Sequence, residues 1–306
     1  MIERFHAAIL AFIFNFGLNL IGPIDGYRKG NGIPTLKAFL LQLIGKIMAS
    51  TSVSSSSSSS PVLAGKVAFI TGGSRGIGAA IVRRLARDGA AVAFTYVSAQ
   101  AEADKLAGEI QAAGGRALAI RADAGDAAAL TAAIAQGARA FERLDILVNN
   151  AGVYLGGELD TFSLEDFDRT IDVNVRATFV AVQAAARHMG DGTGRIVNIG
   201  SINAERVLDA GASVYAMSKA AIVGLTRGLA RDLGARGITV NNVQPGPIDT
   251  AMNPATGPRA ASMHDVMVLP RHGRAEEIAG MVAYLVGPDG GFVTGANLSV
   301  DGGYTV

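Results

Sequence analysis

From Lys66 onward, short apolar runs alternate with longer stretches in which apolar residues recur at helical spacing. The short runs are rich in β-branched residues and too short for buried helices, so they predict strands. They read KVAFIT, AVAFTY, RALAIRAD, LDILVNN, GRIVNIGS, ITVNNVQPG and NLSVDGG. Helices are expected between them, at 76–89, 100–114, 127–141, 163–189, 213–237 and 275–287. This alternation predicts an α/β fold with one doubly wound parallel sheet of about seven strands and helices on both faces.

The first 61 residues depart from this pattern. Residues 36–48, LKAFLLQLIGKIM, have apolar residues at helical spacing and predict an amphipathic helix. Residues 50–60 form a Ser-rich linker that has no means of building a core. We therefore divide the chain into an N-terminal extension, 1–61, and a folded domain, 62–306.

Two interpretations of the extension stay open. It is a targeting or membrane-surface segment, or translation begins at Met48 and residues 1–47 are absent from the natural protein. A membrane-anchored scaffold without catalytic activity would rest on residues 1–47 alone. We expect the core domain to be cytoplasmic and away from membranes, whereas the extension leaves targeting or membrane association open.

Composition and charge exclude several classes of function. With 27 Lys and Arg against 26 Asp and Glu, the chain has no excess of positive charge with which to follow a nucleic acid. The absence of cysteine excludes disulfides, thiolate zinc sites and a cysteine nucleophile, and it suits a reducing compartment. The four histidines, His6, His188, His264 and His272, lack the close spacing of metal ligands, so we expect no metal.

The segment TGGSRGIG, residues 71–78, joins the first predicted strand to the first predicted helix. Glycine lets a backbone turn sharply and approach a ligand closely. A helix that begins near Ile77 would direct its amide groups and the positive end of its dipole at a phosphate. Ile77, Ile81 and Leu85, four residues apart, give that helix a buried face. Taken alone, the segment is also compatible with a glycine-rich turn that holds no ligand.

Further motifs, in order and at compatible spacing, make the chain from residue 62 onward resemble the short-chain dehydrogenase/reductase family. They match its nucleotide loop, its N-N-A-G turn, its Y-x-x-x-K pair, and single Ser, Asn and Pro-Gly positions. The matching residues are Thr71, Gly72, Gly76 and Gly78; Asn149, Asn150, Ala151 and Gly152; Tyr215 and Lys219; and Ser201, Asn174, Pro245 and Gly246. The resemblance implies a Rossmann-type sheet, a dinucleotide cofactor and a homo-oligomer, commonly a tetramer, paired through helices at about 164–189 and 213–235.

Tyr215 and Lys219 are four residues apart, so a helix places them on one face. A nearby ammonium lowers the pKa of a tyrosine, which is ordinarily near 10. We expect this pair to exchange a proton with a carbonyl or alcohol oxygen while hydride moves to or from a nicotinamide. The resemblance further implies that Ser201 hydrogen-bonds the substrate oxygen and that Asn174 holds a water in a proton relay.

The choice of cofactor is a question of charge. The second predicted strand ends FTYVSAQ, with no Asp or Glu before Glu102, whereas Arg75 supplies a cation and Ser98 a hydroxyl. A 2′-phosphate is therefore accommodated, and NADP is favoured over NAD. Asp123 is expected at the adenine, or alternatively as the cap of a helix that starts near Asp126. The full expected cofactor site is Gly72, Ser74, Arg75, Gly76, Ile77, Gly78, Tyr96, Ser98, Asp123, Asn150, Ala151, Gly152, Tyr215, Lys219, Pro245, Gly246, Ile248 and Thr250.

Residues 251–274 form a long segment rich in Pro and Gly, and segments of this length often act as lids. We expect it to determine substrate choice, with Met252, Met263 and Met267 as candidate walls of an adaptable apolar pocket. The function expected is NADP-dependent reduction of a small ketone or aldehyde, or the reverse reaction; the resembled family includes 3-oxoacyl-carrier-protein reductases. The alternative is a nucleotide-binding regulator, because several stretches resemble a branch of the family linked to biofilm dispersal and cyclic di-GMP.

Overall fold

The computed structural model describes residues 60–208 and 210–306. Its seven-stranded sheet has the order β3-β2-β1-β4-β5-β6-β7, and every neighbouring pair is parallel. The strands are β1 (Val67–Ile70), β2 (Ala91–Tyr96), β3 (Ala117–Arg121), β4 (Ile146–Asn149), β5 (Arg195–Ile199), β6 (Thr239–Pro245) and β7 (Asn297–Val300). The chain moves outward from β1 to β3 and then returns to place β4 beside β1, which confirms the doubly wound, Rossmann-type sheet.

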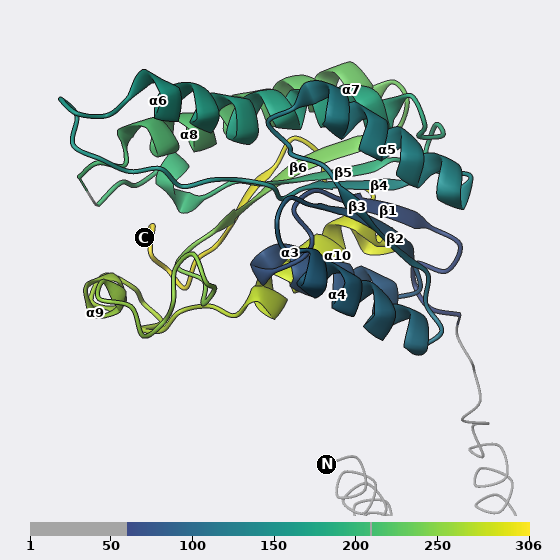
Figure 1. Ribbon diagram of the computed structural model, residues 1–306, viewed down its shortest axis with the longest axis horizontal. Coiled ribbons are helices and arrows are strands. Elements are labelled where there is room, and N and C mark those ends of the chain that lie inside the picture. Colours follow the sequence, from purple (N-terminus) through teal and green to yellow (C-terminus); the bar gives the residue numbers. More distant parts are fainter. Residues whose placement is uncertain (1–59, 209) are drawn as a thin grey trace, which may run out of the picture. The chain divides into compact units, whose positions relative to one another are not determined.

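Helices cover both faces of the sheet (Figure 1). One face carries α3 (Gly76–Arg87), α4 (Gln100–Ala112) and α10 (Ala275–Val286). The other carries α5 (Ala127–Phe141), α6 (Leu164–Ile171), α7 (Ala177–Ala186) and α8 (Ser213–Gly234). The short α9 (Ala260–His264) lies apart from both layers, in the segment between β6 and α10.

Two clusters of buried side chains, one on each face of the sheet, form the core. In β1, Ala68 and Ile70 belong to the cluster under α3 and α10, whereas Val67 and Phe69 belong to the cluster under α5 and α7. Because both faces are covered, the strand is apolar at every position. Fully burying a side chain of the size of Ile or Phe contributes about 1.5–3 kcal/mol. The buried face expected for the first helix is present, since Ile81 and Leu85 of α3 are fully buried.

The stretch expected as one long helix, 163–189, is divided. A π-helical turn, η1 (Asp172–Arg176), separates α6 from α7. Asn174 lies in this turn and is 2% exposed. The irregular turn thus directs a buried polar side chain toward Val153, beyond the end of β4, and toward α8. The alternative role predicted for Asp123, as the cap of the helix near Asp126, is wrong. Asp126 itself caps α5, because its carboxylate accepts from the amides of Ala128 and Ala129.

The described residues include only the last residue of the linker 50–60, so the helix expected at 36–48 and the proposed start at Met48 lie outside them. Among helices in 60–208 and 210–306, none is both long enough and apolar enough to cross a bilayer. The same ranges contain no group of three or more His, Asp or Glu side chains arranged to hold a metal ion.

Candidate active site

Four polar residues meet beside the carboxyl ends of β4 and β5. Tyr215 and Lys219 project from one face of α8, Ser201 lies two residues beyond the end of β5, and Asn174 approaches from η1. Lys219, Ser201 and Asn174 are 6%, 8% and 2% exposed. The carboxyl edge of a parallel sheet is where open α/β proteins hold their ligands. The four residues expected to be catalytic therefore come together at this edge of the sheet.

The pKa of Tyr215 moves in the direction opposite to the sequence-based prediction. Burial raises it above its ordinary value near 10, a hydrogen bond with Ser201 opposes the rise, and the neighbouring Tyr154 adds to it. Lys219 does not offset this rise: its ammonium donates to the backbone carbonyl of Ile199, 3.0 Å away, and lies 5.7 Å from the centre of the Tyr215 ring. Burial lowers the pKa of Lys219 to about 8.

Asn174 is held by three hydrogen bonds. Its amide nitrogen donates to the carbonyl of Val153 and to the hydroxyl of Ser218, both at 3.0 Å, and its side-chain oxygen accepts from the amide of Val153 at 2.9 Å. The hydroxyl of Ser218 in turn donates to the carbonyl of Tyr215 at 2.7 Å. Ser218, missed in the sequence although it lies inside the Y-x-x-x-K motif, thus connects Asn174 to the helix that carries Tyr215. The water relay expected at Asn174 stays a prediction.

The glycine-rich loop is attached to the end of β4 by both side chains and backbone. The hydroxyl of Thr71 accepts from the amides of Asn150 and Ala151 at 3.0 and 2.9 Å. The side chain of Asn150 donates to the carbonyls of Thr71 and Gly72 at 3.0 and 2.9 Å. A Cβ at Gly78 would lie 2.2 Å from the carbonyl oxygen of Gly72, so this close approach of the helix to the loop requires glycine.

The N-terminus of α3 has the properties of a phosphate site. Arg75 is its N-cap residue and makes no side-chain hydrogen bond to the first amides of the helix, which are left for another acceptor. Its own side chain is exposed, and no ion pair engages it among residues 60–208 and 210–306. Ser98, beyond the end of β2, is also exposed. These features fit a dinucleotide with an additional phosphate.

The remaining expected cofactor residues lie at or beyond the carboxyl ends of the strands, with one reassignment. Thr250 lies over it, since a Cβ at Gly76 would be 3.4 Å from the methyl group of Thr250. Asp123 is not a helix cap: its carboxylate accepts from the amide of Gly125 at 2.9 Å and pairs with Arg169 at 3.0 Å. Ile77 is the second residue of α3. The others lie at strand ends or on the loops that follow: Ser74, Tyr96, Gly152, Pro245, Gly246 and Ile248.

Two side chains that the sequence did not single out form a chain of ring contacts that begins at Tyr215. The ring of Tyr154 meets that of Tyr215 edge to face, with centres 5.0 Å apart, and the guanidinium of Arg259 lies 5.9 Å from the centre of the Tyr154 ring. The methionines of the 251–274 segment do not share one environment. Met267 is buried in a cluster with Ile202 and Tyr304, whereas Met252 is 61% exposed.

Comparisons with known proteins agree with this fold. The family model described as enoyl-(acyl carrier protein) reductase matches residues 72–305. The solved structure of a short-chain dehydrogenase/reductase from Serratia marcescens BCRC 10948 is 60% identical, with a TM-score of 0.79, and the match covers 80% of this chain and 100% of that one. A short-chain dehydrogenase from Burkholderia cenocepacia J2315, solved in complex with NADP, is 54% identical with the same TM-score and coverage.

A curated relative belongs to the branch linked to biofilm dispersal and cyclic di-GMP. The cyclic-di-GMP-binding biofilm dispersal mediator protein of Escherichia coli (strain K12) is 49% identical over 240 residues, which are 78% of this chain and 97% of that protein. Fold and site define an α/β protein of dinucleotide-binding architecture. The chain belongs to the short-chain dehydrogenase/reductase family, and the resemblance inferred from its motifs is confirmed.

Proposed function

We propose that this chain is an NADP(H)-dependent oxidoreductase that interconverts a ketone or aldehyde and the corresponding alcohol. The observation that carries the proposal is the meeting of Tyr215, Lys219 and Ser201 at the sheet edge that also carries the glycine-rich loop. The uncapped start of α3 suits the pyrophosphate of either nicotinamide cofactor. Arg75 favours a cofactor with a 2′-phosphate, since residues 94–100 at the end of β2 contain no carboxylate. The Burkholderia relative, solved with NADP, supports the same choice.

NADP(H), when bound, supplies or accepts the hydride. Side chains of the protein donate or accept the proton. The raised pKa of Tyr215 keeps its phenol protonated at neutral pH, as a group that donates a proton to a developing alkoxide must be. Lys219, with a pKa of about 8, is positively charged at pH 7 and would hold the nicotinamide ribose of a bound cofactor. The hydroxyl of Ser201, beside that of Tyr215, orients the substrate oxygen.

The test measures NADPH oxidation with a panel of ketones and aldehydes, for the wild type and for Tyr215→Phe. We expect turnover by the wild type and a loss of about 10²–10⁴-fold in kcat for the variant, with an unchanged Kd for NADPH. An unchanged Kd is the control for folding and for an intact loop. Absence of turnover by the wild type with every compound in the panel would sink the proposal.

A second candidate function is nucleotide-dependent regulation with little or no turnover. It is supported by the 49% identical relative whose name records binding of cyclic di-GMP. Isothermal titration with cyclic di-GMP, performed beside the turnover assay, separates the two candidates. Tight binding by a chain that turns over no substrate would favour the regulator.

We also propose that the protein is a homotetramer in which copies pair through the α6–α7 and α8 helices. Exposed apolar side chains on these helices support this, since Leu164, Phe179 and Met217 are 80%, 47% and 44% exposed. Light scattering coupled to size exclusion should give the mass of four chains. Phe179→Arg should give a smaller species, and a monomeric wild type would overturn the proposal.

A further inference from the structure

A pocket of about 680 Å³ lies at the edge of the sheet opposite the active site. Its lining includes Lys66, which precedes β1, Ala90 and Ala91 at the start of β2, and Arg116, which precedes β3. These are the amino ends of parallel strands, whereas the loop and Tyr215 follow the carboxyl ends. Strands of four to six residues separate the two edges by about 13–20 Å at roughly 3.3 Å per residue.

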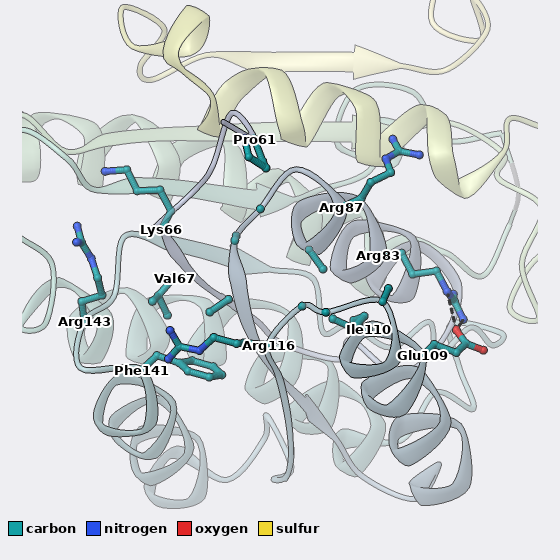
Figure 2. Close-up of a pocket in the computed structure, with 18 residues that line it drawn as sticks. Pro61, Lys66, Val67, Arg83, Arg87, Glu109, Ile110, Arg116, Phe141 and Arg143 are labelled. Carbon is teal, nitrogen blue, oxygen red and sulfur yellow. Dashed lines mark hydrogen bonds and ion pairs between the residues drawn. The ribbon is translucent and has the colours of Figure 1, made fainter. Parts of the chain in front are cut away.

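Positive side chains lie around this amino-edge pocket (Figure 2). Lys66 and Arg143 are on one side, and Arg83 and Arg87 are on the other. Arg116 is the fifth cation of the lining, and Glu109 is its only carboxylate among the described residues. The pocket therefore has a local excess of positive charge in a chain whose overall formal charge is +1.

Carboxylates of the fold engage three of the five cations. Arg83 pairs with Glu109 at 3.0 Å, and Lys66 and Arg143 share the buried carboxylate of Asp145 at 3.4 and 2.6 Å. Ion pairs of this kind are common on protein surfaces. The positions of these three cations are therefore explained without a ligand.

Arg87 and Arg116 have no comparable partner. The nearest carboxylate to Arg87, that of Asp88, is 4.0 Å away and already accepts from Arg84 at 2.8 Å. Arg116 has no ion pair with any residue in the described part of the chain. Two arginines that line the pocket thus keep hydrogen-bond donors available for an anion.

The pocket also has an apolar component. Its lining includes Val67, Ala91 and Ile110, and the ring of Phe141 lies 4.7 Å from the guanidinium of Arg116 (Figure 2). An arginine stacked on an aromatic ring presents a flat surface on which a planar base can pack. A volume of about 680 Å³ is within the range of small-molecule sites.

We propose that the amino-edge pocket binds a nucleotide with at least two phosphate charges, at a site separate from the cofactor loop. Arg87 and Arg116 donate to the phosphates, and the apolar lining with Phe141 accepts the base. Neither the proposed hydride chemistry nor the glycine-rich loop supplies a residue to this site, so the inference stands apart from the proposed function.

The test is calorimetric titration of the full chain with GDP, inorganic pyrophosphate and guanosine, each in the presence of saturating NADPH so that the cofactor loop is occupied. We expect GDP to bind with a Kd at or below about 100 µM, pyrophosphate at least about tenfold more weakly, and guanosine not measurably. The double variant Arg87→Ala, Arg116→Ala should weaken GDP binding by about tenfold for each arginine removed.

The matched control is Arg187→Ala, which removes an exposed arginine that does not line the pocket. It should leave GDP binding unchanged, and all variants should keep the wild-type Kd for NADPH, which shows that they fold. GDP binding that is absent, equally strong for pyrophosphate, or insensitive to the double variant would overturn the inference. A chain that fails to bind NADPH contradicts the proposed function instead, and the arginine dependence of GDP binding is then measured without NADPH.

Discussion

The ammonium of Lys219 donates a hydrogen bond to the backbone carbonyl of Ile199, 3.0 Å away at the end of β5. The lysine is fixed in position but costs stability, because burial lowers its pKa from 10.5 to about 8. Below pH 8 the folded and unfolded chains both hold this proton. Between pH 8 and 10.5 only the unfolded chain holds it, so stability rises with pH across this window.

This rise of stability with pH predicts how the wild type and Lys219→Met will differ. The free energy of unfolding of the wild type, relative to that of the variant, should rise by roughly 3 kcal/mol between pH 8 and 10.5, at about 1.4 kcal/mol per pKa unit. Urea unfolding at several pH values, without cofactor, measures the difference. Parallel curves for the two proteins would show that burial does not govern the proton on Lys219.

Arg75 is expected to discriminate between the two nicotinamide cofactors. Its exposed side chain at the start of α3 has no ion pair in the described residues. A charge-assisted hydrogen bond to a 2′-phosphate contributes about 1.5–3 kcal/mol, so Arg75→Ala should raise the KM for NADPH by about tenfold or more. The KM for NADH is the internal control and should hardly change. Equal effects on both cofactors would place Arg75 on the surface without a role in selection.

Gly78 should not tolerate even a methyl group. Its Cβ would lie 2.2 Å from the carbonyl oxygen of Gly72 and 2.6 Å from the side-chain amide nitrogen of Asn150. Gly78→Ala should therefore destabilise the fold by about 1–3 kcal/mol and weaken NADPH binding. Gly108→Ala, in α4, is the matched control: no atom lies within 4 Å of the Cβ that alanine would add, and this variant should gain about 0.5–1 kcal/mol. Thermal unfolding of both variants measures these changes in stability. Equal Tm values for the two variants would contradict the prediction.

A histidine pair makes the 251–274 segment sensitive to acid. Nε2 of His264 lies 2.7 Å from Nδ1 of His272, and His272 is only 6% exposed. Burial and His264 lower the pKa of His272 below its ordinary 6.5, while Asp249 opposes this. As the pH falls below 6.5, the unfolded chain takes up this proton before the folded chain does, so stability decreases.

His264→Gln tests this pair, because it removes the charge repulsion and leaves a group that can still form hydrogen bonds. The fall in Tm between pH 7 and 5.5 should be smaller for the variant than for the wild type. His188→Gln, at an exposed histidine just beyond the end of α7, is the control and should follow the wild type. Identical pH dependence in all three proteins would exclude the pair as the acid-sensitive element.

Much of the fold and site was determined by local sequence. Strands buried on both faces need apolar residues at every position, so runs such as VAFI in β1 identify a covered parallel sheet without knowledge of their neighbours. Tyr215 and Lys219 share a face because the helical repeat alone decides it. The glycines of residues 71–78 reflect backbone conformations, with φ of +64° at Gly72 and +54° at Gly76, that other residues rarely adopt.

Only the tertiary structure decided how polar groups from distant segments meet. Asn174 bonds Val153, 21 residues away, and Ser218, 44 residues away, because a π-helical turn redirects it. The pKa of Tyr215 rises because packing removes water from its hydroxyl, a quantity that no local spacing contains. The cations of the amino-edge pocket are likewise scattered from Lys66 to Arg143, and parallel strand pairing brings them to one edge.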